Sequence, residues 1–429
     1  MDRGLPGDRV EARVSHVRRR WADARLERVE PLCPDRVPPR CSHVHVCGGC
    51  RFQDLALEAQ VRLKERHVRE TLERIGGLEN PQVRPIVAAP DAWRYRNKME
   101  FSFAPDSDGS PQLGLHVRGA FDRVFELEDC LIASELTVEV VRLTQRFARA
   151  HRWPAYHPRR HEGIARFLVV RHLPLTDQCA VHLVAASDQL DGLDAWAREV
   201  AATSPAIQGV SLLINRARAN VAIGEEERLL QGRATVVERL LGLEFEAGAA
   251  SFLQTNSRAA EGLYQGAIAA AAATPDDVVL DLYCGTGTLT LLFARVAGEA
   301  IGVESVEPAV IAARANAVRN RVTNARFEAG ESRAVLRQWA RGERAGAPRP
   351  SIVVVDPPRA GLHPRVVARI AELTPRRVIY VSCNPATLAR DLKDFAALGF
   401  ALDHVTPFDL FPHTPHIECV ARLERTASV

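Results

Sequence analysis

The spacing of apolar and polar residues divides the chain into stretches with different predicted elements. In the first 40 residues, apolar and polar positions alternate, as in DRVEARVSHV and ARLERVEPL, which favours short strands of a small β element. From Asp54 to Gly76, apolar residues recur at helical spacing. We therefore expect one amphipathic helix there, with Asp54 as its N-cap and Gly76 at its end.

Two larger regions follow this helix. Residues 86–250 combine strand-like runs such as RFLVVRHL, CAVHLVAA and GVSLLINR with a helical stretch near residues 190–202, which indicates a central α+β domain. In residues 251–429, buried-strand patterns alternate with helical patterns; the strands are DVVLDLYCG, AIGVES, SIVVVDPPR and RVIYVSCNP. This alternation is typical of an α/β fold with a doubly wound, Rossmann-like sheet, whose ligands bind at the carboxyl ends of the strands.

Length and composition limit the class of protein. A chain of 429 residues is long enough for two or three domains. No apolar run approaches the roughly 18 to 20 residues of a membrane span, and the first residues lack the apolar centre of a secretory signal, so we expect a cytoplasmic protein without a membrane partner. The net charge of +3 does not decide whether nucleic acid is a partner. Lysine occurs only at Lys64, Lys98 and Lys393, an arginine bias typical of GC-rich codon usage.

Nine cysteines are many for a compartment that keeps thiols reduced. Three of them lie close together in CSHVHVCGGC, at Cys41, Cys47 and Cys50, on a loop without helical or strand periodicity. Clustered thiolates select zinc or iron–sulfur centres, and either centre needs a fourth ligand. Three residues compete for that position: Cys33, His45 and Cys130. The spacing alone leaves the metal and the fourth ligand open.

The segment VVLDLYCGTGTLTLLFA predicts a strand that ends at Asp281, a tight turn at Gly285 and Gly287, and a helix from near Thr288. About twenty residues later, AIGVES ends in Glu304, whose carboxylate is suited to accept hydrogen bonds from ribose hydroxyls. The run G-T-G-T-L-T lacks the third glycine of a dinucleotide fingerprint, which favours S-adenosylmethionine over NAD. A turn with a purely structural role is the alternative, and the acidic residue argues against it.

Two further strand ends carry candidate chemistry. SIVVVDPPRAGL presents Asp356 before two prolines, a pattern that suits a capping turn or an amino-group methyltransferase equally well. The next strand, RVIYVSCNPATLARDL, presents Cys383, which amino methylation does not need. Carbon 5 of a pyrimidine is a poor nucleophile until a nucleophile adds at carbon 6, and a thiolate suits that addition. A cysteine simply packed at a strand end is the alternative.

A thiol nucleophile needs a lowered pKa, and we name Arg390 as the candidate cation because it follows Cys383 closely in the sequence. After methyl transfer, the proton on carbon 5 must leave, which requires a general base. FDLFPHTPHIECVARL offers Glu418, a carboxylate in an otherwise apolar terminal strand, although a salt-bridged surface glutamate would also fit. We assign Cys284 and Cys419 to packing.

Together these segments resemble the RNA uracil-5-methyltransferase family, whose members depend on S-adenosylmethionine, and specifically its iron–sulfur branch that modifies 23S ribosomal RNA. The resemblance covers nearly the whole chain: CSHVHVCGGC is similar to the cluster loop, YRNKMEF to a central-domain signature, and SFLQTN and DLYCGTGTLTL to cofactor-contacting segments. It implies a [4Fe-4S] cluster held by four thiolates: Cys41, Cys47, Cys50 and Cys130.

The same resemblance implies roles for individual residues. Cys383 matches the nucleophile, Glu418 the base, and Asp356 a catalytic residue that lines both the cofactor and the uracil, with Phe252 near the target base. The implied contacts to S-adenosylmethionine are Gln254, Tyr283, Thr288, Glu304, Glu331 and Asp356. GLPGDRVEARV is similar to the second half of the RNA-binding TRAM β-barrel, and the preceding strands are missing from the pattern, so we expect a partial N-terminal barrel.

The sequence thus predicts five segments: a partial TRAM-like RNA-binding element (1–40), an iron–sulfur loop with a fourth ligand near residue 130 (41–50), a helix packed on the catalytic domain (51–85), a central α+β domain (86–250) and a methyltransferase domain (251–429). We expect a monomer that methylates carbon 5 of one uridine, flipped out of 23S ribosomal RNA. The alternatives are a tRNA uracil-5-methyltransferase, an RNA cytosine-5-methyltransferase and a non-catalytic RNA-binding iron–sulfur protein.

Overall fold

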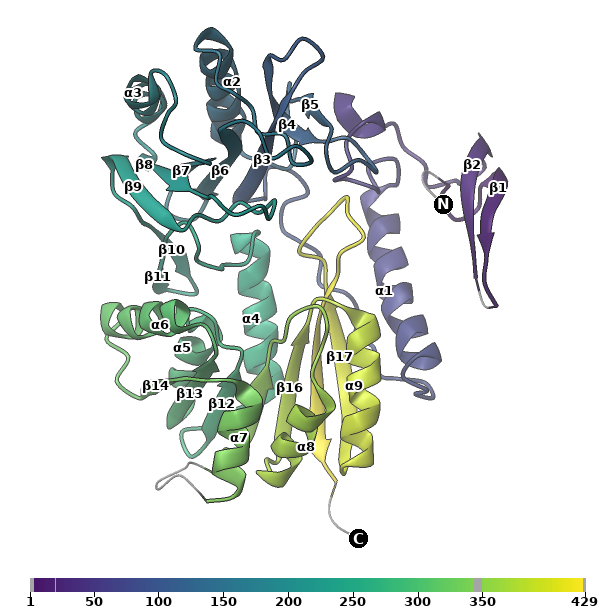
Figure 1. Ribbon diagram of the computed structural model, residues 1–429. Coiled ribbons are helices and arrows are strands. Elements are labelled where there is room, and N and C mark those ends of the chain that lie inside the picture. Colours follow the sequence, from purple (N-terminus) through teal and green to yellow (C-terminus); the bar gives the residue numbers. More distant parts are fainter. Residues whose placement is uncertain (1–3, 20, 343–348, 427–429) are drawn as a thin grey trace.

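The computed structural model describes residues 4–19, 21–342 and 349–426. Two seven-stranded sheets build two lobes, and a small N-terminal hairpin stands apart from both (Figure 1). None of the helices in these ranges is long and apolar enough to cross a membrane.

The lobe built by residues 251–426, the predicted methyltransferase domain, is called the catalytic lobe here, and its sheet has the strand order β14-β13-β12-β15-β16-β18-β17. In that order the strands are Ala325–Ala329, Glu299–Glu304, Val278–Leu282, Ile352–Val355, Arg377–Ser382, Glu418–Arg425 and Phe400–Phe408. The first five strands run parallel to one another, and β18 is antiparallel to both of its neighbours. The doubly wound sheet predicted from the sequence is therefore confirmed, and its parallel strands all end at one edge.

Helices cover both faces of this sheet, which explains why its strands are apolar at nearly every position. Neighbouring residues of a strand point to opposite faces, so Val279 and Leu280 of β12 lie in different clusters. One face packs against α4 (Ser257–Ala271), α5 (Thr288–Ala294) and α6 (Glu307–Arg319). The other face packs against α1 (Leu57–Arg74), α7 (Ser332–Ala340), α8 (Pro364–Glu372) and α9 (Pro385–Ala397).

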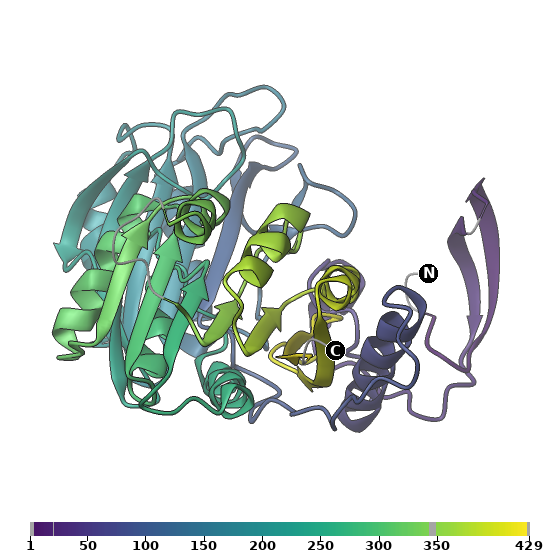
Figure 2. The ribbon, with the colours of Figure 1, turned by 90° about the horizontal axis from the view of Figure 1, so that it is seen from below.

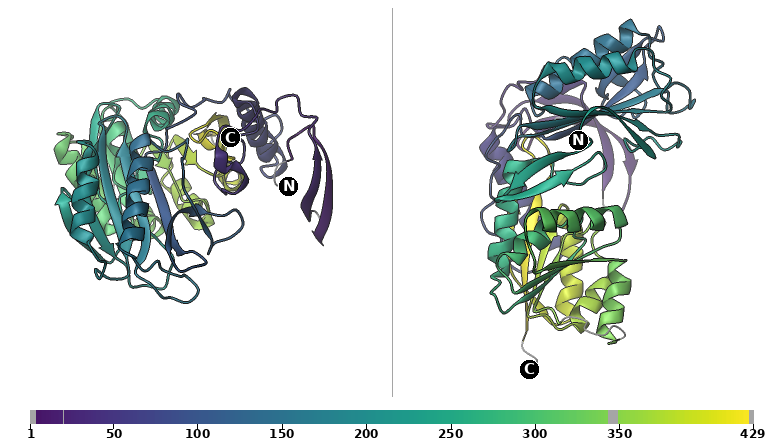
Figure 3. Two further views of the ribbon diagram at one scale, coloured as in Figure 1. Left: turned by 90° about the horizontal axis from the view of Figure 1, so that it is seen from above. Right: turned by 90° about the vertical axis from the view of Figure 1, so that its left-hand side faces the viewer.

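The central lobe contains the second sheet, with the order β5-β4-β3-β6-β7-β8-β9. These strands are Val124–Glu126, Pro111–His116, Lys98–Pro105, Ala165–Leu173, Gln178–Ala185, Ile207–Ile214 and Glu226–Gly232. Helices α2 (Glu135–Ala150) and α3 (Leu193–Thr203) lie on one face (Figure 3), where Trp153 and Trp196 are buried. The three predicted strands and helix α3 are present, whereas α2 was not predicted.

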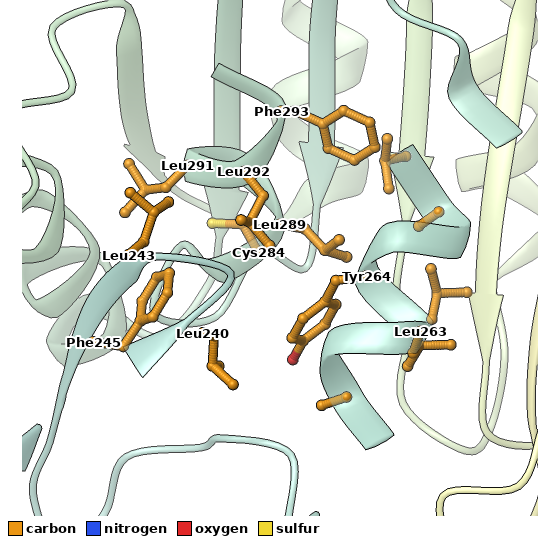
Figure 4. Packing of buried hydrophobic residues seen from close by; sticks show 14 of the residues in the cluster. Leu240, Leu243, Phe245, Leu263, Tyr264, Cys284, Leu289, Leu291, Leu292 and Phe293 are labelled. Atoms are coloured by element: carbon orange, nitrogen blue, oxygen red, sulfur yellow. The ribbon is translucent and has the colours of Figure 1, made fainter. Parts of the chain in front are cut away.

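A hairpin of β10 (Val236–Leu240) and β11 (Leu243–Ala247) lies between the lobes. Figure 4 shows Leu240 and Phe245 of this hairpin gathered with Tyr264 of α4 and Leu292 of α5. All four side chains are nearly inaccessible to solvent. The hairpin is thus part of the hydrophobic cluster of the catalytic lobe.

At the N-terminus, β1 (Arg9–Val17) and β2 (Ala22–Glu30) form a two-stranded antiparallel sheet that lies beyond α1 (Figure 2). Within the described ranges no third strand joins it. We predicted Asp54 as the N-cap of α1, and this prediction is wrong. The helix begins after Ala56, and Asp54 forms an ion pair with Arg36 at 2.9 Å. Near the predicted end, a Cβ on Gly76 would lie 2.2 Å from the Leu72 carbonyl oxygen, so this close approach requires glycine.

Candidate active site

A cavity of about 700 Å³ opens where the parallel strands of the catalytic sheet end. Most of the predicted site residues line it: Gln254, Tyr283, Thr288, Glu304, Asp356, Cys383 and Glu418. Glu331 does not; it is exposed at the N-cap position of α7, although its charge helps to raise the pKa of Tyr283. Residues from several separate elements and loops therefore meet in one place, and the shared edge of the parallel strands accounts for Tyr283, Glu304, Asp356 and Cys383.

Glu418 is the first residue of the antiparallel strand β18 and lies at the same edge of the sheet. Ser382, the last residue of β16, pairs with Cys419 in β18. Cys383 directly follows Ser382 and Glu418 directly precedes Cys419, so the register sets the predicted nucleophile and the predicted base side by side. Glu418 is 4% exposed, whereas Cys383 is only half-buried.

The glycine turn and the acidic strand end are joined to each other. Gly285 and Gly287 have φ values of 54° and 86°, and a Cβ on Gly287 would lie 2.9 Å from the ring of Phe327. The backbone N–H of Gly285 donates to Glu304 Oε2 at 3.1 Å. Glu304 Oε1 accepts from the backbone N–H of Val306 at 2.9 Å. The loop backbone therefore fixes the orientation of the Glu304 carboxylate.

Asp281 is a feature of the site that the sequence did not reveal. Strand β12 extends one residue past it, to Leu282, and its side chain is inaccessible to solvent. Oδ2 accepts a hydrogen bond from the Thr290 hydroxyl at 2.6 Å, while Oδ1 has no partner among the described residues. Burial raises the pKa of Asp281 to about 7. Because Asp281 lines the cavity, its unpaired oxygen is available to a ligand that donates a hydrogen bond.

We predicted from sequence distance that Arg390 lowers the pKa of Cys383. The structure instead assigns this effect to Arg359. Arg390 Nε donates to Asp391 at 2.8 Å and Nη2 donates to the Ala360 carbonyl at 2.9 Å. Burial raises the pKa of the Cys383 thiol, and positive charge on Arg359 opposes that rise. Arg359 follows the two prolines after Asp356, a position that the sequence motif could have identified.

Two carboxyl groups next to Cys383 have strongly raised pKa values. Burial, and then the charge of Asp356, raises the pKa of Glu418 to about 8. Burial of its carboxyl group raises the pKa of Asp356 to about 7. A group that titrates near neutral pH can both accept and release a proton during turnover. The arrangement therefore combines a thiol with an adjacent acid–base group in one cavity.

A second cavity, of about 730 Å³, is lined by all four of the predicted cluster ligands: Cys41, Cys47, Cys50 and Cys130. Burial raises the pKa of Cys50 to about 12, with smaller contributions from the three other thiols. Of the other two candidates for the fourth ligand, Cys33 packs instead with Leu5 and Leu55, and His45 does not line the cavity. Arg118 attaches the loop to the central lobe by donating to the Cys47 carbonyl at 3.0 Å.

All nine cysteines are free thiols. As the side chains stand, no three His, Cys, Asp or Glu residues of the described ranges form a group that could hold a metal ion. The chemistry of the four thiols suits an iron–sulfur cluster, because a cationic cluster would offset the cost of ionising buried thiols. Their positions are not those of a formed ligand set, and the iron–sulfur site remains a prediction.

Known proteins resemble the chain over nearly its full length. The model of the tRNA (Uracil-5-)-methyltransferase family matches residues 89–426. An uncharacterised RNA methyltransferase of Chlorobaculum tepidum is 42% identical over 438 residues (98% of this chain, 90% of the relative), and one of Nitratidesulfovibrio vulgaris is 38% identical over 425 residues (99% and 90%). The crystal structure of Pyrococcus abyssi tRNA (uracil-54, C5)-methyltransferase in complex with S-adenosyl-L-homocysteine matches with a TM-score of 0.77 and 28% identity, covering 98% and 94% of the two chains.

Proposed function

Since the chain belongs to the tRNA (uracil-5-)-methyltransferase family of S-adenosylmethionine-dependent RNA methyltransferases, we propose that it methylates one uridine through a covalent adduct on Cys383. The observation that carries this mechanism is the register of β16 and β18, which sets Cys383 next to Glu418. Glu418 is only 4% exposed and burial raises its pKa to about 8, which argues against the alternative of a salt-bridged surface glutamate.

In the first step, the Cys383 thiolate adds to carbon 6 of the uracil, forming a sulfur–carbon bond. The electron pair of the carbon 5–carbon 6 double bond moves to the carbonyl at carbon 4, which makes carbon 5 nucleophilic. S-adenosylmethionine, when bound along the glycine turn, would supply the electrophilic methyl group: carbon 5 would take the methyl group, and the electron pair of the sulfur–methyl bond would leave with S-adenosylhomocysteine. Arg359 favours this step because its charge lowers the pKa of the Cys383 thiol and so increases the thiolate fraction.

In the second step, Glu418 removes the proton from carbon 5. The electron pair of that C–H bond restores the carbon 5–carbon 6 double bond, the sulfur–carbon bond breaks, and Cys383 leaves as a thiolate. Burial and the neighbouring Asp356 raise the pKa of Glu418 to about 8, which makes the ionised carboxylate a stronger base than an ordinary glutamate.

The cofactor site in this proposal lies along the glycine turn. Glu304 accepts hydrogen bonds from the ribose hydroxyls, and Gln254, Tyr283 and Thr288 line the remaining contact surface. The unpaired Oδ1 of Asp281 fits a ligand with an ammonium donor, as S-adenosylmethionine has in its amino-acid part. Glu331 stays a proposed neighbour of the adenine, supported only by the effect of its charge on Tyr283, which lines the cavity.

Two variants test the assignment of nucleophile and base. Cys383→Ala should bind RNA, transfer no methyl group and form no covalent complex, because it has no thiol to add. Glu418→Gln should transfer one methyl group and then stall, because nothing removes the carbon 5 proton. The stalled complex should survive denaturing electrophoresis and carry label from the methyl donor. Turnover of Glu418→Gln at the wild-type rate, or a covalent band with Cys383→Ala, would contradict these roles.

We propose 23S ribosomal RNA as the substrate, on the strength of the cysteine loop, and the N-terminal hairpin with the rest of residues 1–40 as a TRAM-like RNA-binding element. The matching solved structure is a tRNA enzyme, so tRNA is the alternative. Transcripts of both RNAs, incubated with labelled S-adenosylmethionine, distinguish them. Label in tRNA alone, mapped to carbon 5 of a uridine, would move the substrate to tRNA and leave the mechanism intact.

We also propose a [4Fe-4S] cluster on the four thiols of the second cavity. Protein purified without air should be brown and contain iron and sulfide near four each per chain, as four thiolate ligands imply. Cys130→Ser should lose the colour, whereas Cys33→Ser should keep it, since Cys33 packs in a separate hydrophobic cluster. Stoichiometric zinc with no iron in an anaerobic preparation would overturn the cluster.

A further inference from the structure

The loop of residues 409–417, called the base loop here, connects β17 to Glu418 and is held by a buried ion pair. Lys64 Nζ of α1 lies 2.6 Å from Asp409 Oδ1 and donates a second hydrogen bond to the Phe411 carbonyl at 3.1 Å. The side chains of Lys64 and Asp409 are 1% and 4% exposed. A buried charge of this kind is costly unless it is paired, so the pair ties the start of the base loop firmly to α1.

A second contact from the same helix holds the far part of the base loop. Gln60 lies one turn before Lys64, so both side chains project from one face of α1. Gln60 Oε1 accepts from the backbone N–H of His413 at 2.8 Å. Its amide nitrogen donates to the Leu55 carbonyl at 2.7 Å, which fixes the orientation of the amide. Helix α1 therefore contacts the base loop at its start, through Lys64, and at His413, through Gln60.

The carbonyl groups of the base loop are also bound from other directions. Asn256 Nδ2 of the segment before α4 donates to Leu410, and the Tyr95 hydroxyl donates to Pro412 at 3.0 Å. The backbone N–H groups of residues 51 and 52 both donate to His413 at 2.9 Å. The loop rises from the catalytic lobe toward the central lobe without helix or strand structure (Figure 1). Its path is therefore set largely by these contacts from other segments, beside its own backbone hydrogen bond from the Thr414 N–H to the Phe411 carbonyl at 3.2 Å.

The composition of the chain indicates that Lys64 cannot be replaced freely. Arginine supplies nearly all cations, yet a lysine stands at this buried position. A compact ammonium with three donors fits between the Asp409 carboxylate and the Phe411 carbonyl, whereas a planar guanidinium is wider and points its donors elsewhere. A position that only needed positive charge would be served by arginine as well.

We propose that Lys64 is a positioning residue for the proton-removal step, because it sets the base loop that ends at Glu418. This inference rests on the proposed function of Cys383 and Glu418. Nucleophilic addition and methyl transfer use Cys383 and the glycine turn, which lie outside the base loop; the loop reaches the nucleophile only indirectly, through the contact of His416 with Arg359 at 3.1 Å. Proton removal uses Glu418, whose Cα follows the loop directly. Displacing the loop should therefore slow adduct release more than adduct formation.

The test uses Lys64→Met in the full chain, with exposed Lys393→Met on α9 as the matched control. Single turnover on a uridine-containing RNA, with labelled S-adenosylmethionine, gives the rates of methyl transfer and of adduct release separately. We expect about tenfold slower release, methyl transfer within about threefold of wild type and an unchanged Kd for S-adenosylmethionine. The methylated covalent complex should then accumulate as it does in Glu418→Gln, and combining the two substitutions should slow release no further.

Two outcomes overturn the proposal: release at the wild-type rate, or equal loss of cofactor binding, methyl transfer and release, which is the signature of a purely structural role. If Lys64→Met does not fold, Lys64→Met with Asp409→Asn removes both charges and avoids an uncompensated carboxylate. This double variant should fold and still release slowly, because the Phe411 carbonyl has lost its donor. If Glu418→Gln gives no adduct in the same assay, the proposed function fails, whatever the Lys64 variants do.

Discussion

Arg359 Nη2 lies 3.1 Å from His416 Nδ1, and both side chains line the cavity that contains Cys383 and Glu418. The pKa of His416 is lowered, first by burial of its ring and then by the charge of Arg359. A neutral imidazole can accept a hydrogen bond from the guanidinium without opposing its charge. Arg359 is thereby held where its charge lowers the pKa of both Cys383 and Glu418.

The first prediction concerns this charge. Arg359→Gln should raise the pKa of the Cys383 thiol, so less thiolate is present at neutral pH and adduct formation slows by about tenfold. The rate should recover as the pH rises, which moves the ascending limb of the pH profile to higher pH. Single-turnover adduct formation measured across the pH range checks this, with Arg359→Lys as the charge-retaining control. A lower rate with an unshifted profile would mean that Arg359 contacts RNA and does not tune the thiol.

The second prediction concerns the cofactor. Glu304→Ala removes the carboxylate that Gly285 and Val306 hold in place, and should weaken S-adenosylmethionine binding by about 1 to 3 kcal/mol. Calorimetry measures this loss directly. Glu307→Ala, an exposed glutamate at the start of α6, is the matched control and should bind normally. Unchanged affinity in Glu304→Ala would place the cofactor elsewhere in the cavity.

The sequence predicted the parts of the site that follow buried parallel strands. Glu304, Asp356 and Cys383 each end an apolar run, and the topology of such sheets brings those ends to one edge. Glu418 was found for another reason, because a lone carboxylate in an apolar strand needs an explanation. The doubly wound sheet followed from the alternation of strand and helix patterns.

Other parts of the site could not be predicted, because their partners are distant in the sequence. Lys64 and Asp409 are 345 positions apart, and no local sequence motif around either residue predicts the other. The raised pKa of Asp281 depends on burial by residues of several elements, which no local pattern records. The wrong choice of Arg390 has the same cause. Arg390 is close to Cys383 in the sequence, but its guanidinium donates to Asp391 and to a loop carbonyl.

The third prediction is a pH dependence of stability in the ligand-free protein. Burial raises the folded-state pKa of Glu418 to about 8, far above the value of about 4.3 expected in an unfolded chain. For an acid with a raised pKa, stability is fully present below the unfolded pKa and is lost as the pH rises through the folded pKa. Relative to wild type, Glu418→Gln should therefore gain free energy of unfolding from pH 5 to pH 9, measured by urea titration. A constant difference across that range would show that Glu418 is not desolvated.

The fourth prediction concerns Phe252, whose side chain is 65% exposed and lines both cavities. An exposed aromatic ring at the entrance to a base-binding cavity is suited to stack on a nucleobase, which contributes about 1 to 3 kcal/mol per base. Phe252→Ala should therefore raise the Kd for RNA by about tenfold or more while leaving the Kd for S-adenosylmethionine unchanged. Phe252→Tyr keeps the ring and should bind RNA normally.

Phe252→Leu separates stacking from simple burial of apolar surface, because it keeps much of the apolar area without a planar ring. If stacking carries the contact, this variant should resemble Phe252→Ala in filter-binding or fluorescence titrations with RNA. If apolar contact alone suffices, Phe252→Leu should bind RNA like wild type. The ring would then contribute only apolar surface between the two cavities. Loss of S-adenosylmethionine affinity in all three variants, with RNA binding intact, would instead assign Phe252 to the cofactor side of the cavity.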